Sequence, residues 1–433
     1  MNSSRQKTVL LGLNELNFEY IQEYINQGYL SNFSALFKNY GYTKTTSEKE
    51  YELLEPWIQW VSIHTGKSYD EHQVFRLGDI VNRPDLKQLW EVGEEKGLSV
   101  GGVSPFNARN NLKNPAFFVP DPWTQTVASG SKTLIRLSRA VSSAVNNNAN
   151  QKLGFSSLVD LLKGMATFVP AGRFGHYFYL ASKFKKKVAK PAILDNLLAD
   201  TFIQSWKTSS PDFSSLFLNS GAHIQHHYMF NSRVYKGPQR NPSWYCPPDE
   251  DPLLDILQEY DLIIGRLMKL GCRLFIATGL HQNPHDENTF YWRLKDHAEF
   301  LKRIGIHQVR GVSPRMSRDF LIDCTDKAQA VDIEMKLSEL HLKGDDEKLF
   351  TIDNRGDSLF VELTYSKELK PGSDIMANGR SMNIDLLSFV SFIAIKNGEH
   401  DGIGYFIDTG KKYSPSSSMQ VKDIFTEIVQ TFD

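Results

Sequence analysis

Histidine and glutamate side chains in three distant segments are the best candidates for chemistry. Imidazole and carboxylate groups bind divalent metals, and they also move protons as general acids or bases near neutral pH. Three histidines, His223, His226 and His227, fall within one short run, while Glu55 and His400 stand far from it in the chain. Either these side chains meet in one site, or they are hydrogen-bonded residues with no metal. The elements that carry them decide between the two.

Short apolar runs alternate along the chain with amphipathic stretches of helical spacing. The alternation predicts an α/β fold, in which a mainly parallel sheet is covered by helices on both faces. We expect a pocket at the carboxyl ends of its strands. The expected strands are Thr8–Leu13, Leu98–Val103, Phe213–Leu218, Leu274–Ala277 and Gly404–Ile407, and the clearest helical patterns are Phe18–Tyr40 and Leu253–Leu270.

Two segments interrupt this alternation. Residues 105–209 are rich in helix formers and are expected to form a helical cap, and residues 284–381 are expected to form a small α+β insertion. The insertion contains a strand-like Asp319–Cys324, a helical Lys327–Leu342 and a hairpin-like Leu349–Tyr365. The core α/β part is then made of the remaining three pieces, residues 1–104, 210–283 and 382–433.

Separate motifs in the expected order resemble the alkaline phosphatase superfamily, in its type I phosphodiesterase and phosphoglycerate-mutase-like branch. The first strand ends in Gly12-Leu13-Asn14-Glu15, similar to the family's Gly-Leu-Asp-Gly. A segment from Glu55 to Lys67 is similar to the nucleophile segment, Ala222–Tyr228 to Asp-Arg-Ile-Gln-His-x-x-Trp, and Gly398–Ile403 to the closing Gly-x-His-x-x-x-Gly. The resemblance spans most of the core and leaves out both insertions.

The departures from the family pattern alter the metal site that the resemblance implies. Asn14 stands where the first Asp ligand is expected, Glu55 or Pro56 where a Thr or Ser nucleophile is expected, and Ala222 where another Asp is expected. Ala277-Thr278-Gly279-Leu280 replaces Ser-Asp-His-Gly. On this alignment, only His226 and His400 remain as metal ligands, so two-metal phosphoryl transfer is not expected.

His281 follows the altered strand end and could join His226 and His400 in a site of three nitrogens with an open position for water. We therefore expect one divalent metal, zinc or manganese, or a site without metal. Glu55 is expected to act as general base, nucleophile or fourth ligand, with Asn14 and His226 as further catalytic candidates.

Four more residues are candidates for substrate binding. On an extended segment His223 and His227 would share a face with each other but not with His226. The aromatic residues Trp57 and Tyr228 belong either to the core or to the pocket wall, where a ring could stack on a sugar, base or choline-like group.

Bulk properties narrow the class of partner. Net charge is −1, from 49 basic and 50 acidic residues, which gives no argument for nucleic acid or an anionic membrane. A basic run, Lys183–Lys190, could contact an anionic ligand or a lipid surface but is more simply a solvated face. The three cysteines are far apart, no signal peptide is recognised, and no stretch is apolar enough to cross a membrane. We expect a cytoplasmic protein with a small-molecule or glycan substrate.

Three functions remain open from the sequence. The first is an enzyme with a remodelled site that hydrolyses or transfers a phosphorus or sulfur ester or a related group. The second is a catalytically silent relative that binds an anionic metabolite or a protein partner. The third is a group transferase in glycan or natural-product biosynthesis, for which the cap would suit a bulky substrate. The oligomeric state is not predicted.

Overall fold

The computed structural model describes residues 5–146, 154–183, 187–315, 318–414 and 416–433. The chain forms two compact units, each described here by itself. Unit 1 comprises Met1–Lys236, Pro248–Pro284 and Gly398–Asp433, and unit 2 comprises Gly237–Pro247 and His285–Asn397. Every candidate site residue predicted from the sequence belongs to unit 1. The segment boundaries predicted from the sequence stay a prediction.

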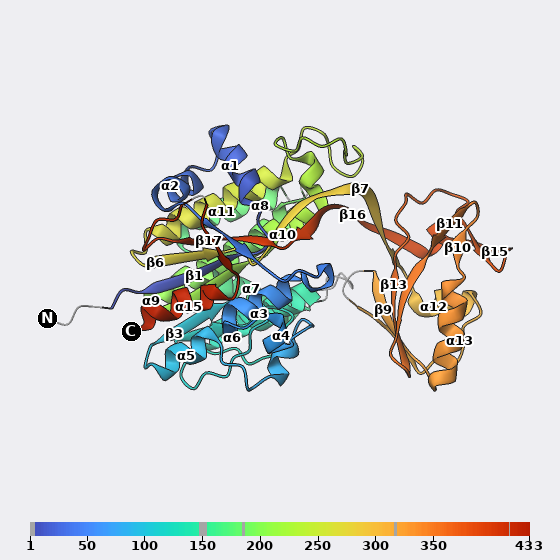
Figure 1. Ribbon diagram of the computed structural model, residues 1–433, viewed down its shortest axis with the longest axis horizontal. Helices are drawn as coiled ribbons and strands as arrows, with labels where there is room; N and C mark the ends of the chain where they lie inside the picture. The colour runs from blue at the N-terminus through green and yellow to red at the C-terminus, as the bar shows by residue number, and fades with distance from the viewer. Residues whose placement is uncertain (1–4, 147–153, 184–186, 316–317, 415) are drawn as a thin grey trace. The chain divides into compact units, whose positions relative to one another are not determined.

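The centre of unit 1 is an eight-stranded, mainly parallel sheet (Figure 1). Its middle strands β1, β5 and β3 are buried along their whole length, as their apolar sequences predict. Only β17 runs antiparallel to its neighbours, β6 and β2. The strand order is β18 (Ser418–Gln420), β2 (Thr43–Thr46), β17 (Ile403–Asp408), β6 (Arg273–Ala277), β1 (Thr8–Leu13), β5 (Phe213–Leu218), β3 (Val100–Val103) and β4 (Phe117–Val119).

Helices cover both faces of this sheet, so the predicted α/β class is confirmed (Figure 1). On one face, aromatic side chains such as Trp60 and Trp90 pack against Phe213 and Phe217 of the sheet. On the other face, Phe202 packs against Phe117. The first face carries α3 (Pro56–Thr65), α5 (Leu89–Glu95) and α15 (Asp423–Val429); the second carries α9 (Ala189–Ser209), with α10 (Ser220–Tyr228), α11 (Pro252–Met268) and α2 (Ser31–Tyr40) packed in turn.

Two elements of unit 1 differ from the sequence prediction. The amphipathic stretch Phe18–Tyr40 is two helices, α1 (Phe18–Asn26) and α2, because the chain takes positive φ angles of 88° at Gly28 and 60° at Leu30. The expected cap is largely helical, but its strand β4 joins the edge of the main sheet. Its helices are α6 (Lys132–Asn146), α7 (Phe155–Phe168), α8 (Phe174–Ser182) and α9.

Across the described residues, no helix has both the length and the apolar character to cross a bilayer.

Unit 2 is the α+β part that the sequence predicts. The chain enters it along β7 (His281–Leu294) and leaves along β16 (Val390–Asp401). The expected hairpin is present as β12 and β13, whereas the expected helix ends early because His341 and Leu342 form a strand. One four-stranded sheet has the order β12 (Phe350–Asn354), β13 (Ser358–Leu363), β9 (Asp319–Asp323) and β8 (Gly311–Pro314). The other has the order β11 (Asp345–Lys348), β10 (His341–Leu342), β14 (Asp374–Ala377) and β15 (Arg380–Asp385). The main helices of unit 2 are α12 (His297–Arg303) and α13 (Lys327–Ser338).

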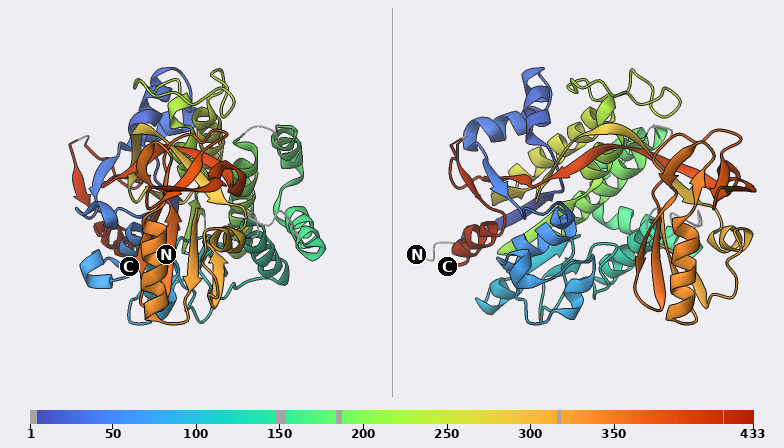
Figure 2. Two further views of the ribbon diagram at one scale, coloured as in Figure 1. Left: turned by 90° about the vertical axis from the view of Figure 1, so that its right-hand side faces the viewer. Right: turned by 45° about the vertical axis from the view of Figure 1, so that its right-hand side comes forward.

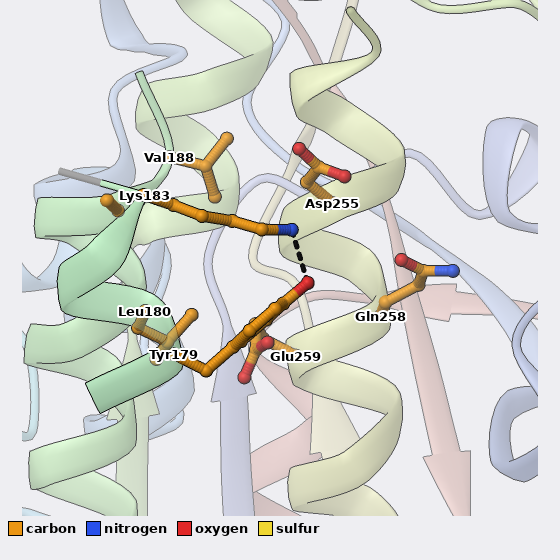
Figure 3. A pocket seen from close by; sticks show the side chains of 8 residues that line it. Tyr179, Leu180, Lys183, Val188, Asp255, Gln258 and Glu259 are labelled. Atoms are coloured by element: carbon orange, nitrogen blue, oxygen red, sulfur yellow. Dashed lines mark hydrogen bonds between the residues drawn. The ribbon is translucent and has the colours of Figure 1, made fainter. Parts of the chain in front are cut away.

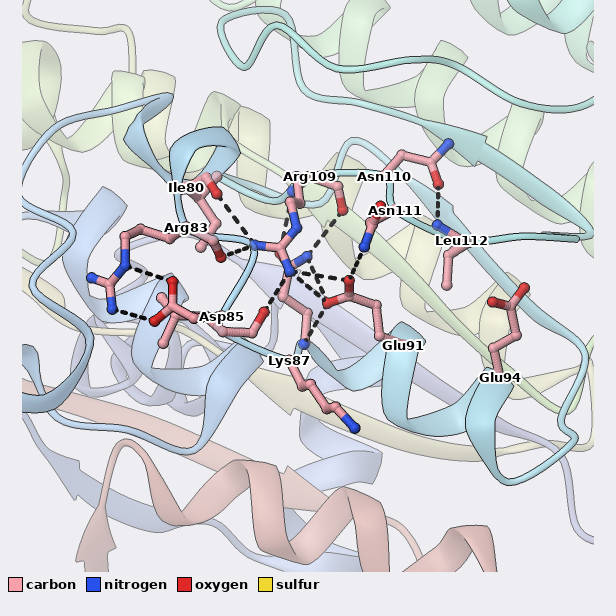
Figure 4. Close-up of polar contacts among 12 residues, drawn as sticks. Ile80, Arg83, Asp85, Lys87, Glu91, Glu94, Arg109, Asn110, Asn111 and Leu112 are labelled. Carbon is pink, nitrogen blue, oxygen red and sulfur yellow. Dashed lines mark hydrogen bonds and ion pairs between the residues drawn. The ribbon is translucent and has the colours of Figure 1, made fainter.

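A buried arginine fixes the chain that follows β3 in unit 1 (Figure 4). Arg109 forms an ion pair with Glu91 of α5 at 3.1 Å and donates to the carbonyl oxygen of Leu86 at 2.6 Å. The Gln88 side chain in turn donates to the Arg109 carbonyl oxygen at 3.0 Å. A buried cation is stable only when such partners surround it, so this network is structural.

Candidate functional site

The candidate residues gather at one edge of the main sheet. Leu13 of β1 lies opposite Leu218 of β5, and Gly12 lies opposite Ala277 of β6, so these parallel strands end together. Strand β17 runs the other way and begins at the same edge, where Ile403 pairs with Thr46, the last residue of β2. Loops that follow β1, β2, β5 and β6 and the segment that precedes β17 therefore meet there.

Glu15 is the centre of this meeting point. It follows β1, its side chain is only 3% exposed, and its Oε2 lies 3.0 Å from Nε2 of His226 and 3.1 Å from Nε2 of His400. The three residues offer one ligand atom each, and those atoms lie within 4.8 Å of one another. The sequence prediction of His226 and His400 thus gains a carboxylate partner that it had not singled out.

Asn14 holds Glu15 in place from the side. Its Nδ2 donates to Oε1 of Glu15 at 2.7 Å and to Asn219 at 2.8 Å, while its Oδ1 accepts from the indole of Trp60 at 2.8 Å. Asn14, which stands where the family's first Asp ligand is expected, therefore has its side-chain carbonyl oxygen bound by Trp60. The structure places Asn14 as a residue that orients the carboxylate.

Two glutamines complete the surroundings of Glu15. Gln225 of α10 donates to the Glu15 carbonyl oxygen at 2.6 Å. Gln282 of β7, fully buried, donates to Oε2 of Glu15 and to the carbonyl oxygen of Ala222 at 3.1 Å. Neither Gln282 nor Glu15 was predicted as a site residue from the sequence. The signal that could have indicated Gln282 was its position directly after His281.

Glu55 approaches the same cluster from the solvent side. Its Oε2 lies 3.6 Å from Nδ1 of His400, and its side chain is 32% exposed. Glu55 is the N-cap residue of α3, but its side chain makes no capping hydrogen bond there. His400 is thus placed between two carboxylates, Glu15 at one ring nitrogen and Glu55 at the other.

Burial and neighbouring charges shift the pKa values of Glu15 and Glu55 in opposite directions. Burial opposes the ionisation of Glu15, but His400 and His226 outweigh it and hold the pKa of Glu15 far below its usual range. Burial raises the pKa of Glu55 to about 7, with His400 opposing the rise and the charge of Glu15 adding to it. Burial would lower the pKa of His400, yet Glu15 and Glu55 raise it. The site therefore pairs a permanent carboxylate with one that titrates near neutral pH.

His281 does not join the cluster, so the expected site of three histidine nitrogens is not what the structure shows. Its Nδ1 lies 2.5 Å from the carbonyl oxygen of Ile403, and its Nε2 lies 3.1 Å from Oδ1 of Asn283. Both ring nitrogens are occupied by these contacts. Glu15 takes the third position instead.

The other histidines lie on a helix, not on the extended segment considered from the sequence. In α10, His223, His226 and His227 are three and four residues apart and share a face. The ring centroids of His223 and His227 are 5.0 Å apart, and those of His226 and His400 are 5.1 Å apart. A continuous row of imidazoles therefore runs along α10 to the cluster.

The two aromatic candidates are placed differently. The indole of Trp57 donates to the Phe75 carbonyl oxygen at 3.0 Å and packs against the core beneath α3. Tyr228 is buried, with its ring 6.4 Å from that of His227. Neither ring belongs to the group formed around Glu15, and their role in substrate binding stays a prediction.

The donor set fits a small divalent metal. Two imidazoles and one carboxylate are common ligands of zinc, and in a tetrahedral zinc site the ligand atoms stand roughly 3.3 Å apart. The Glu15 oxygen lies 3.0 and 3.1 Å from the two imidazole nitrogens, and all three ligand atoms lie within 4.8 Å of one another. Among the residues that the structure describes, this is the one group of three or more such side chains found close enough to hold an ion.

Comparisons with known proteins give structural matches only. No family model matches the sequence, and no curated protein matches it. Phosphonoacetate hydrolase from Sinorhizobium meliloti 1021, in complex with phosphonoacetate, is 12% identical, with 99% of this chain and 96% of that chain covered and a TM-score of 0.47. Murine ectonucleotide pyrophosphatase / phosphodiesterase 5 is 10% identical, with 99% and 95% covered and a TM-score of 0.42.

The alkaline phosphatase from the Antarctic bacterium TAB5 is a third solved structure of this kind. It is 10% identical, with 99% of each chain covered and a TM-score of 0.41.

Proposed function

We propose that this chain is a divergent member of the alkaline phosphatase superfamily, and that it hydrolyses or transfers a phosphorus ester group of a small molecule at a site with one divalent metal. The observation that carries the proposal is the convergence of Glu15, His226 and His400, with Glu55 beside them, at the carboxyl edge of the sheet. Motif order in the sequence supports the same location. Fold alone would not select a reaction, since chemistry depends on the side chains of the site.

Glu15, His226 and His400 would hold the metal, with zinc or manganese as the candidates. The carboxylate of Glu15 stands in for the negative charge missing at Asn14 and Ala222. With Glu15 as the one charged ligand of a dication, the metal and its ligands would keep a net positive charge, which attracts an anionic ester. When bound, the ion would supply positive charge that stabilises the charge developing on the ester oxygens.

In this proposal Glu55 would act as the general base and general acid. Its carboxylate contacts His400 while remaining partly exposed, so water and substrate can reach it. It can accept a proton from an attacking water or alcohol and return it to the leaving group. His223 and His227 would contact an anionic substrate from α10, with Trp57 and Tyr228 as more distant candidates.

A binding protein without catalysis is the second candidate, and one observation favours it. Oε2 of Glu15 already receives nitrogen donors from His226, His400 and Gln282, so this carboxylate oxygen has hydrogen-bond partners without an ion. Such a site would bind an anionic metabolite through the imidazoles. Metal dependence separates the two candidates.

The test uses chelator-treated protein to which zinc or manganese is added back. Aryl phosphate monoesters, phosphate diesters and sulfate esters serve as substrates, with and without an acceptor alcohol that would reveal transfer. We expect ester cleavage that requires the metal and falls at least about a hundredfold in His226→Ala and His400→Ala. The exposed His307, changed to Ala, is the matched control and should keep full activity.

Two results together would contradict the enzyme and favour the binding protein: the protein takes up no metal when zinc or manganese is supplied, and none of these substrates reacts. An activity that survives chelation would contradict the metal while keeping the catalytic role of Glu55, which Glu55→Gln then tests.

A further inference from the structure

Helix α7 exposes an apolar stripe. Phe155, Leu158 and Leu162 are exposed, the first by 83%, and their spacing of three and four residues puts them on one side of the helix. The opposite side is buried through Gly164, which packs against Leu137 of α6. A helix that is apolar on its buried side and also on its solvent side is unusual in a water-soluble protein.

Helix α8 adds large exposed rings to the same part of unit 1. Phe178 is 73% exposed and Tyr179 is also exposed, while Tyr177 and Leu180 face the interior. The ammonium group of Lys183 lies 4.2 Å from the centre of the Tyr179 ring, at a pocket next to Asp255 and Glu259 of α11 (Figure 3). Rings with a cation alongside are typical of side chains at a membrane interface.

Among the described residues from 154 to 190, the exposed charged side chains are the basic Lys163, Lys187 and Lys190, whereas Arg173 pairs with Asp200 and Lys183 lies beside Asp255 and Glu259. One described residue of this stretch is acidic, Asp160. Lys187, which precedes α9, and Lys190, in its first turn, are exposed, and α9 packs on both α7 and α8. Figure 2 shows α7 and α8, in green, at the outside of unit 1.

We propose that α7, α8 and the start of α9 dock the protein on the surface of an anionic phospholipid bilayer. The exposed apolar side chains would enter the boundary between head groups and acyl chains, and the lysines would contact the lipid phosphates. None of these helices could span the bilayer, so the contact is interfacial. Positive charge beside the apolar stripe favours an anionic lipid over a second copy of this chain, which would bring like charges together. The inference does not depend on the proposed function.

Vesicle flotation with the full chain tests this surface. We expect the protein to float with vesicles of phosphatidylcholine and about 30% phosphatidylserine, less with phosphatidylcholine alone, and less in about 0.5 M salt. The variant Phe155→Ser/Leu158→Ser/Leu162→Ser should reduce the bound fraction at least about tenfold, and Lys187→Glu/Lys190→Glu should remove the preference for anionic lipid. The matched control is Val331→Ser/Met335→Ser, which removes two exposed apolar residues from α13 of unit 2 and should bind as the unchanged protein does.

Two results would overturn the proposal. One is an unchanged protein that stays out of the floating fraction with anionic vesicles, or a triple variant that floats equally well. The other is a dimer in sedimentation equilibrium that the triple variant converts to monomer while neither form floats, because the apolar stripe would then cover a second copy.

Discussion

At the scale of single residues, Glu15 is both a strained residue and the carboxylate that contacts two histidines. It adopts a φ of 59°, a left-handed conformation that costs a non-glycine residue roughly 1 kcal/mol. Its backbone is held by Gln225 and by Thr278, whose carbonyl oxygen accepts from the Glu15 N–H at 3.0 Å. Contacts of this kind fix a strained residue, and here they point its carboxylate between two imidazoles.

Glu55 gives a prediction on stability in protein kept free of metal by a chelator. Its pKa of about 7 in the folded chain is above its ordinary value of 4.5, so its contribution to stability is full below pH 4.5 and is lost as the pH rises through 7. Glu55→Gln cannot ionise and should be more stable than the unchanged protein above pH 7, by about 1 to 2 kcal/mol after allowance for solvent screening.

Urea unfolding at pH 5 and pH 8 measures this difference. Glu19→Gln is a matched control, because Glu19 is exposed and pairs with the exposed Lys44. A Glu55→Gln variant that lost the same stability as the unchanged protein between the two pH values would show that Glu55 ionises normally.

Site residues could be predicted from the sequence where a motif fixed both the residue and the element. His226, His400 and Glu55 were singled out in this way, and the structure brings them together. Glu15 was missed because it occupies a glycine position of the motif, where no side chain is expected. His281 was chosen because its imidazole follows the altered strand end. Its neighbour Gln282 reaches Glu15 instead, and this could not be predicted because the sequence does not reveal which side of a strand faces the site.

At the scale of elements, β1 and α3 must pack closely to bring Asn14 and Glu15 into position. Gly12 makes this possible, since a Cβ there would lie 2.7 Å from Phe217 and 2.7 Å from Trp60. Trp60 is also the residue that donates to Asn14. A side chain at position 12 would therefore disturb the core and the site together.

Gly12→Ala should lower the free energy of unfolding by about 1 to 3 kcal/mol, because the added methyl overpacks the core between β1 and α3. It should also weaken metal binding through the displaced Trp60. Gly172→Ala is the control, since a Cβ at that position has nothing within 4 Å. Equal stability of the two variants in urea would contradict the packing argument.

Strands were easier to predict than helix limits. The runs Thr8–Leu13 and Phe213–Leu218 are strands with those same bounds, because fully buried parallel strands are continuous apolar runs. The break between α1 and α2 depends on a left-handed Leu30, which no propensity favours. The helical form of α10 was also not expected, and it is this form that lines up its three histidines.

At the scale of the whole molecule, the site depends on the complete fold of unit 1. Glu15 follows β1, His226 lies in α10 and His400 lies in β16, and the chain passes through unit 2 between the last two. Alternating apolar and amphipathic segments were enough to predict the α/β class and five of the eight strands of the sheet. The exposed stripe on α7 could not be predicted, because an apolar helix looks the same in sequence whether its second face is covered or open.

Anomalous diffraction at the zinc edge, from crystals grown with zinc, tests the central claim most directly. The account predicts one strong peak within bonding distance, about 2.0 to 2.2 Å, of a Glu15 oxygen and of Nε2 of His226 and His400, and the loss of that peak in Glu15→Gln. Crystals in which Glu15 remains hydrogen-bonded to both histidines, with no peak between them, would contradict it.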